Sequence, residues 1–144
     1  MNEFFGECEK GTRYSKSGVK IYEGSFKDGK YHGQGTWYSG WMKRYEGGWQ
    51  NGKYHGDGIE YWVDGVKRYE GSWQNGKRNG EATQYWSDGV RRYEGGWENN
   101  QKHGIGIQYH QNGVVESQGY WKCHDRIRFH IVKDCDGSII EYLA

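Results

Sequence analysis

A five-residue segment that recurs at a nearly constant interval constrains the fold of this chain more than any other feature. The segment is Tyr22-Glu23-Gly24-Ser25-Phe26, and it recurs with Trp in place of Phe at residues 45–49, 69–73 and 93–97, in steps of 23, 24 and 24 residues. A worn fifth copy keeps Gly119 and Trp121 but has Ser117 at the tyrosine position. Such a period is typical of arrays in which each unit buries its apolar face against its neighbours. We therefore predict an array of about five repeats.

A second motif runs in phase with the first. His32-Gly33-Gln34-Gly35 returns at residues 55–58, 79–82 and 103–106, and a tyrosine follows three residues after each copy. The third copy is the least regular, because Asn79 replaces the histidine and Ala82 replaces a glycine. Ahead of the first full copy, Gly11 and Tyr14 match Gly58 and Tyr61, so the chain begins with half a repeat.

Each repeat contains two turn signals. One set is Asp28-Gly29, Asn51-Gly52, Asn75-Gly76 and Asn99-Asn100, and the other is Ser39-Gly40, Asp64-Gly65, Asp88-Gly89 and Asn112-Gly113. Asn-Gly and Asp-Gly tolerate the positive φ angles that tight hairpin turns require. The segments between the turns are rich in Tyr, Trp and Ile, which indicates strands. The sequence therefore predicts an all-β fold, in which antiparallel hairpins form one elongated, twisted sheet.

We divide this single continuous domain into three parts. Residues 1–21 form the half-repeat, residues 22–122 the repeats, and residues 123–144 a C-terminal capping hairpin. In the last part Ile127, Phe129 and Ile131 alternate with polar residues, Asp136-Gly137 predicts a turn, and an apolar segment follows. Repeat arrays need atypical ends of this kind.

Strand alternation assigns the repeated side chains to two faces. Tyr45, Gly47 and Trp49 share one face, and Arg44 and Glu46 share the other, with the same division in the later copies. Each tyrosine is expected to lie over a glycine of the neighbouring strand, an arrangement that rescues a glycine in a sheet. The Arg/Glu face forms a charged ladder, for which a solvated surface is the first interpretation and a binding strip the second.

The combined pattern Y-E-G-x-W-x-x-G-x-x-H-G-x-G resembles the MORN (membrane occupation and recognition nexus) family over residues 10–122. Aromatic, glycine and histidine positions all recur together, which makes the match specific. The resemblance implies an array that serves in protein interaction or dimerisation, or that accompanies a catalytic domain such as a kinase or a SET-domain methyltransferase. Neither domain is recognisable in this sequence.

The composition excludes several classes of protein. Aromatic residues make up 17% of the chain, and 20 basic residues nearly balance 19 acidic ones. Disordered chains are poor in aromatic residues, and nucleic-acid-binding proteins carry basic patches, so neither class fits. No apolar run is long enough for a membrane span, and no secretory signal is recognisable. We interpret Cys8, Cys123 and Cys135 as reduced thiols and expect a cytoplasmic protein, peripheral to a membrane or the cytoskeleton at most.

Catalysis and metal binding are not expected. His32, His55 and His103 lie one hairpin apart, about 9–10 Å, which is too far for one zinc ion. The tail residues Cys123, His124, His130 and Cys135 match no common zinc spacing. Serines are scattered, and the recurring carboxylates are repeat positions that folding explains. We expect no enzyme, metal or cofactor.

The aromatic face is the candidate partner site, although the first interpretation of these rings is that they are the packed core of a thin sheet. The candidate residues are Tyr22, Phe26, Tyr45, Trp49, Tyr69, Trp73, Tyr93 and Trp97. The leading hypothesis is a scaffold that binds a protein partner, as a peptide or helix, through this trough, with a homodimer also open. The alternatives are weak peripheral binding of acidic phospholipids and a regulatory subunit of an enzyme complex. Near-zero net charge disfavours the lipid alternative, since Lys43-Arg44, Lys67-Arg68 and Arg91-Arg92 each lie close to a glutamate.

Overall fold

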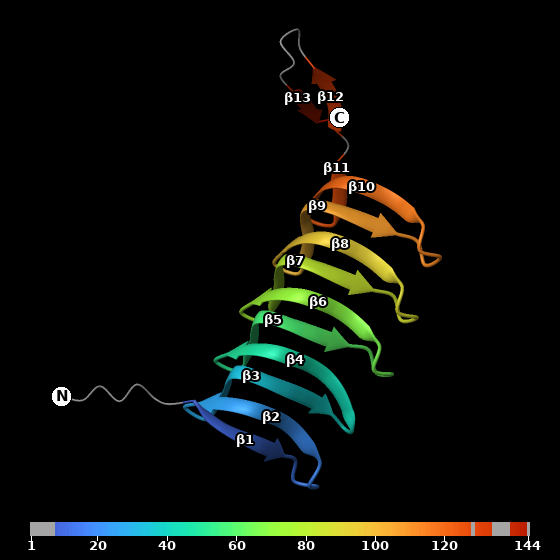
Figure 1. The fold of residues 1–144 in the computed structure, drawn as a ribbon. Helices are drawn as coiled ribbons and strands as arrows, with labels where there is room; N and C mark the ends of the chain where they lie inside the picture. Colours follow the sequence, from blue (N-terminus) through green and yellow to red (C-terminus); the bar gives the residue numbers. More distant parts are fainter. Residues whose placement is uncertain (1–7, 128, 134–138, 144) are drawn as a thin grey trace, which may run out of the picture.

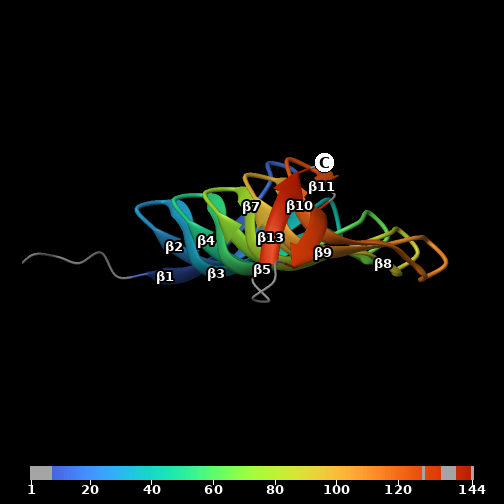
Figure 2. The ribbon, with the colours of Figure 1, turned by 90° about the horizontal axis from the view of Figure 1, so that it is seen from above.

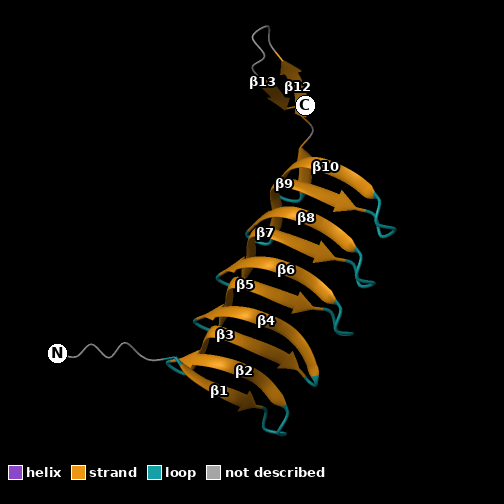
Figure 3. Ribbon diagram, in the orientation of Figure 1, coloured by secondary structure: helices purple, strands orange, loops and turns teal. Residues whose placement is uncertain are grey.

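The computed structural model describes residues 8–127, 129–133 and 139–143, and this part of the chain contains strands and no helix (Figures 1 and 3). Eleven strands form one sheet. They are β1 (Glu9–Tyr14), β2 (Lys20–Lys27), β3 (Lys30–Ser39), β4 (Met42–Gln50), β5 (Lys53–Tyr61), β6 (Lys67–Gln74), β7 (Lys77–Tyr85), β8 (Arg91–Glu98), β9 (Gln101–Tyr109), β10 (Val115–Lys122) and β11 (Asp125–Ile127).

The sheet is a simple meander. Each strand pairs antiparallel with the next one in the sequence, from β1 to β11, without a crossover. Figure 1 shows the strands bowed and stacked in chain order, and Figure 2 shows that this sheet is a single layer. The predicted all-β array of antiparallel hairpins is therefore confirmed.

Two-residue turns close the hairpins at one edge of the array. Asn51 and Gly52 adopt φ angles of 50° and 77° between the paired residues Gln50 and Lys53. Both angles are positive, as a type I′ turn requires, and the right-handed strand twist favours that turn. Equivalent turns lie at residues 28–29, 75–76 and 99–100, as predicted. A fifth lies at Cys123-His124, which the turn signals in the sequence did not reveal.

A line of small residues crosses the middle of the sheet. Gly47 pairs with Gly35 on one side and with Gly58 on the other, and the same pairing continues strand by strand. The line comprises Gly11, Gly24, Gly35, Gly47, Gly58, Gly71, Ala82, Gly95, Gly106 and Gly119. A Cβ atom on Gly58 would lie 2.2 Å from Tyr45 Oη, so the tyrosine covers this glycine as predicted.

The core is a row of alternating tyrosine and tryptophan rings on one face of the sheet. Tyr45 packs edge-on against Trp49 of its own strand at 5.2 Å and against Trp73 of the next repeat at 5.7 Å, measured between ring centroids. Trp121 packs in the same way on Tyr93 and is 5% exposed, so the worn fifth copy keeps its place in the core. These contacts confirm that Tyr45 and Trp49 share a face.

The predicted Arg/Glu ladder is wrong, because each arginine occupies a β-bulge. Glu60 pairs with Tyr69 and Tyr61 pairs with Lys67, which leaves Arg68 as an extra residue without a partner position. A bulge redirects the side chains of its strand. Lys67 therefore reaches Glu70, while Arg68 lies on the Tyr/Trp face with Glu60. Arg44 and Arg92 are the extra residues in their own strands.

The C-terminal segment forms a hairpin of its own. Strands β12 (Phe129–Lys133) and β13 (Ile139–Leu143) pair as a separate two-stranded sheet. The predicted turn at Asp136-Gly137 lies outside the described residues. That this hairpin caps the array stays a prediction, and so do the boundaries at residues 21 and 122, because one sheet continues through both.

Candidate functional site: a groove with a glycine floor

The predicted partner-binding rings lie in the core. Tyr22, Tyr45, Tyr69 and Tyr93 have no exposed surface, and Trp49, Trp73 and Trp97 are 4–6% exposed, while Phe26 is half-buried against them. The tyrosine hydroxyls are satisfied internally, as Tyr45 Oη donates to Gly48 O at 2.9 Å. Burial raises the pKa of Tyr22 and of Tyr93 to about 12. Partner binding by these eight residues stays a prediction, but seven of them offer almost no accessible surface.

A column of side chains just after the two-residue turns covers the tyrosines. Tyr54 stacks on Tyr45 with 3.7 Å between centroids, and Tyr31 stacks on Tyr22 in the same way. In the next two repeats cations take this position, with Arg78 Cζ 4.7 Å from the Tyr69 centroid and Lys102 Nζ 5.0 Å from that of Tyr93. Sequence reasoning missed this cover, although its regular place three residues after Asp28, Asn51, Asn75 and Asn99 was a visible signal.

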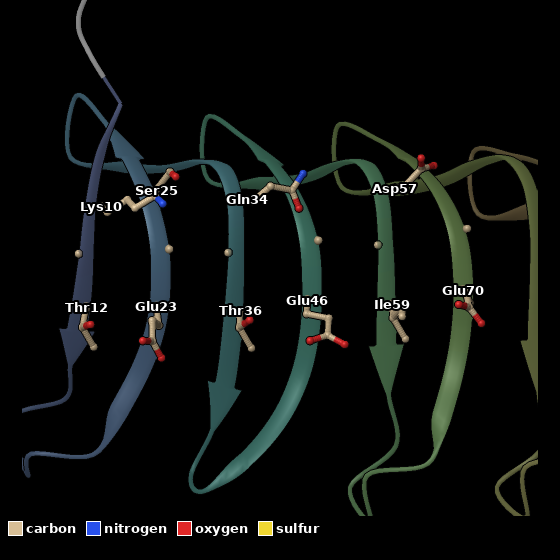
Figure 4. A pocket seen from close by; sticks show the side chains of 16 residues that line it. Lys10, Thr12, Glu23, Ser25, Gln34, Thr36, Glu46, Asp57, Ile59 and Glu70 are labelled. Carbon is tan, nitrogen blue, oxygen red and sulfur yellow. The ribbon is translucent and has the colours of Figure 1, made fainter.

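The opposite face of the sheet is open. A cavity of about 1030 Å³ crosses strands β1 to β6, and a second of about 490 Å³ lies over β7 to β9. Figure 4 shows two rows of side chains there, one with Lys10, Ser25, Gln34 and Asp57 and the other with Thr12, Glu23, Thr36, Glu46, Ile59 and Glu70. We call this surface the glycine-floored groove, because the line of paired glycines lies between the rows.

Cross-strand pairing builds one wall of the groove. Glu46 pairs with Thr36 of β3 and Ile59 of β5, and the row continues on both sides. It comprises Thr12, Glu23, Thr36, Glu46, Ile59, Glu70, Thr83, Glu94 and Ile107, with a glutamate on every second strand. The glutamates are the same position of the repeat, so their spacing follows from the sequence period.

Cations and tyrosine hydroxyls hold the wall glutamates in position. Glu46 accepts hydrogen bonds from Lys43 Nζ at 2.8 Å and from the Tyr61 hydroxyl of the next repeat. These bonds, first from Lys43 and then from Tyr61, lower the pKa of the Glu46 carboxyl. Glu70 and Glu94 have the equivalent partners, namely Lys67 with Tyr85 and Arg91 with Tyr109. The other wall adds Asp57 and Glu81, so hydrogen-bond acceptors and carboxylates predominate along the groove.

Two histidines, His55 of the recurring set and His124 of the last turn, join neighbouring repeats. His55 Nδ1 accepts a hydrogen bond from the backbone N–H of Asn75 in the next turn at 3.4 Å, and His124 Nδ1 accepts one from the N–H of Lys102 at 3.3 Å. Within the described ranges no three His, Cys, Asp or Glu side chains gather as a metal site would require. The side chains of His130 and Cys135, part of the tail cluster considered above, fall outside the description, so the absence of bound metal stays a prediction.

The single-layer meander, its Tyr/Trp core and its glycine line define the class of β-hairpin repeat arrays. The sequence profile of the MORN repeat family matches residues 22–41, 45–67, 69–91 and 93–115, and the chain belongs to this family. Among curated proteins no match is found. The part of the chain that the structure describes has no helix long and apolar enough to cross a membrane.

Proposed function

We propose that the protein is a non-catalytic scaffold that binds an extended segment of a protein partner in the glycine-floored groove. The observation that carries this proposal is the line of paired glycines, unbroken from β1 to β6, between a row with a glutamate on every second strand and a second polar row. The side-chain positions of Gly35, Gly58 and Gly106 point at the tyrosines of the other face, so the floor of the groove is bare backbone that a ligand backbone can approach closely. The groove thus differs from the Tyr/Trp face, where rings fill the equivalent space.

The chemistry of the groove favours a basic or neutral polar segment. Glu23, Glu46, Glu70 and Glu94 repeat on every second strand, and each already pairs with one cation of its own repeat. Asp57 and Glu81 on the other wall have no salt-bridge partner among the described residues, and carboxylates are strong acceptors for N–H groups and ammonium groups. Complementary charge at an interface speeds association and disfavours wrong partners. A second copy of this chain, or an enzyme to which the protein is a regulatory subunit, would have to present such a segment.

Acidic phospholipid is the weaker candidate. Lys43 and Lys67, which the sequence offered as basic positions, are held in ion pairs with Glu46 and Glu70. Arg68 and Arg92 lie against the rings of Trp62 and Trp86 instead of forming a basic patch. Membrane surfaces attract clusters of free basic side chains. We place the protein in the cytoplasm, which the free thiols of Cys8 and Cys123 support.

The test compares two adjacent residues of β7 that face opposite sides. Thr83 lines the groove, and Gln84 pairs across to Tyr93 on the Tyr/Trp face. Thr83→Trp fills the groove, whereas Gln84→Trp leaves it open. Proteins captured from native extract by the wild-type chain should be lost with Thr83→Trp and retained with Gln84→Trp. Retention by the first variant and loss by the second would overturn the proposed binding face.

A further inference from the structure

Two cations on the Tyr/Trp face share one internal carboxylate in the middle of the array. Glu60 Oε2 lies 2.6 Å from Arg78 Nη2, and Glu60 Oε1 lies 3.2 Å from Arg68 Nη1. Arg78 packs over the ring of Tyr69, and Glu60 pairs with Tyr69 across the strands. The glutamate and Arg78 are well covered, with side-chain exposures of 19% and 14%. The fold therefore builds a site that holds a carboxylate between two cations beside a buried tyrosine.

The next repeat contains the same cations without the carboxylate. Gln84 occupies the position of Glu60 and pairs with Tyr93. Arg92 is the bulged arginine equivalent to Arg68, and Lys102 lies over Tyr93 as Arg78 lies over Tyr69. Within residues 8–126, no carboxylate lies at salt-bridge distance from Arg92 or Lys102. The substitution of one residue leaves both positive charges uncompensated.

Lys102 is a partly buried cation without a carboxylate partner at salt-bridge distance among the described residues. Its ammonium group lies 4.8 Å from the Trp121 centroid and donates to the side-chain oxygen of Gln108. Burial, and then the charge of Arg92, lower the pKa of Lys102 to about 8. Glu116 on β10 attracts the ammonium group from a distance, without closing an ion pair. The buried Nε of the bulged arginine has no hydrogen-bond partner in Arg44, Arg68 or Arg92, but Arg68 has a salt bridge to Glu60 through Nη1, whereas no such bond is found for Arg92 among the described residues. Both cations thus have unused capacity to donate to an anion.

We infer that Gln84, Arg92 and Lys102 form a binding site for a carboxylate supplied from outside the repeat, which takes the charge-compensating role of Glu60 in the preceding repeat. A planar carboxylate suits an arginine, whose N–H groups form a fork that matches its two oxygens. The amide of Gln84 adds a neutral donor where a glutamate would repel the incoming anion. The source is either a free small carboxylate or an acidic side chain of a bound polypeptide. This site lies on the opposite face from the glycine-floored groove, so its loss in Gln84→Trp leaves capture through the groove intact, and the two proposals fail separately.

The experiment is a titration of the full chain with sodium acetate, at ionic strength kept constant with chloride, followed by NMR of the Lys102 Nζ and Arg92 Nε resonances. We expect saturable shifts of both resonances in the wild type. Gln84→Glu places the carboxylate inside the repeat and should weaken the acetate response by at least about tenfold, because the site is already occupied. Equal responses in the wild type and in Gln84→Glu, or no response beyond that to chloride, would overturn the inference.

The preceding repeat supplies the matched control. Glu60→Gln removes the internal carboxylate and should create a second acetate response, read at the Nε resonances of Arg68 and Arg78, which the wild type lacks. Inorganic phosphate serves as a competing probe, and phosphate binding more than about tenfold tighter than acetate would refute the carboxylate assignment. A tetraglutamate peptide separates the two sources, since tighter binding than acetate indicates an acidic polypeptide and equal binding a free carboxylate. Either of these two results supports the site.

Discussion

A single methyl group added to the glycine line, as in Gly58→Ala, should destabilise the protein. In Gly58→Ala the new Cβ would lie 2.2 Å from Tyr45 Oη and 2.4 Å from Tyr45 Cζ. Carbon atoms in proteins approach to about 3.5–4.0 Å, so the ring must move by more than 1 Å. It has little room, because Tyr54 stacks on one face at 3.7 Å and Trp49 and Trp73 bound its edges.

The expected loss of stability is about 1–3 kcal/mol. Overpacking a filled core costs about 1–3 kcal/mol. Displacement of Tyr45 also strains its hydrogen bond to Gly48 O and that of Trp73 Nε1 to Gly58 O, and each such bond contributes about 0.5–1.5 kcal/mol. The replacement of glycine by alanine also reduces the conformational entropy of the unfolded chain, which offsets about 0.4–1 kcal/mol of this loss of stability. The melting temperature should therefore fall by about 2–4 °C for each kcal/mol.

The reverse substitution, alanine to glycine, can be made in the third repeat as Ala82→Gly. Ala82 occupies the glycine position there, and Trp97 Nε1 is buried without a hydrogen-bond partner, whereas Trp49 and Trp121 donate to the equivalent carbonyls at 3.0 and 3.1 Å. An unsatisfied buried donor costs about 1–3 kcal/mol, and glycine in a strand costs about 0.5–1 kcal/mol. Ala82→Gly should stabilise the protein by about 1 kcal/mol. Urea unfolding followed by tryptophan fluorescence measures the stability of both variants. A Gly58→Ala protein as stable as the wild type would show that Tyr45 is not packed tightly against Gly58.

Three further predictions follow from the charges. Glu60→Gln leaves two partly covered arginines without their carboxylate, and should lower the free energy of unfolding in urea by about 1–3 kcal/mol. Glu23→Gln removes an exposed ion pair and should lower it by less than about 1 kcal/mol. Equal losses in the two variants would contradict this prediction. The folded-state pKa of Lys102, about 8, lies below its ordinary value of 10.5, so its charge disfavours folding most strongly below pH 8. Lys102→Met should therefore stabilise the protein at pH 7, and that gain should fade as the pH rises from 8 to 10.5; a gain independent of pH would contradict the burial of the charge. Vesicles with phosphoinositides should sediment little of the protein at physiological salt, and tight, salt-resistant sedimentation would restore the lipid hypothesis.

Local sequence signals were sufficient to predict the fold. Asp28-Gly29 and Asn51-Gly52 adopt the positive φ angles that their residue types favour, and the repeat period fixed the strand order. The turn at Cys123-His124 escaped notice because neither residue is typical of a type I′ turn. The antiparallel pairing of β10 with β11 imposes this turn conformation. The turn therefore depends on the array and not on the residue types of Cys123 and His124.

The open face was harder to predict than the strands. Simple alternation placed Arg68 beside Glu70, but a bulge at Arg68 moves this side chain to the Tyr/Trp face. Alternation identified Tyr45 and Trp49 as neighbours, yet it could not show that Tyr54 and Arg78 cover such rings from the adjacent strands. Which face stays open depends on these long-range contacts, so the groove became visible only in three dimensions.

Photocrosslinking from the two faces of β7 identifies the face that binds the partner. Benzoylphenylalanine is placed at Thr83, which lines the glycine-floored groove, or at Gln84, which faces the Tyr/Trp side. Each variant is irradiated in complex with the protein captured from native extract, and the cross-linked peptides are sequenced by mass spectrometry. We expect abundant cross-links from position 83 to one extended, lysine-rich or arginine-rich segment, and few to that segment from position 84. Cross-links from position 84 alone would contradict the assignment of the groove as the binding face.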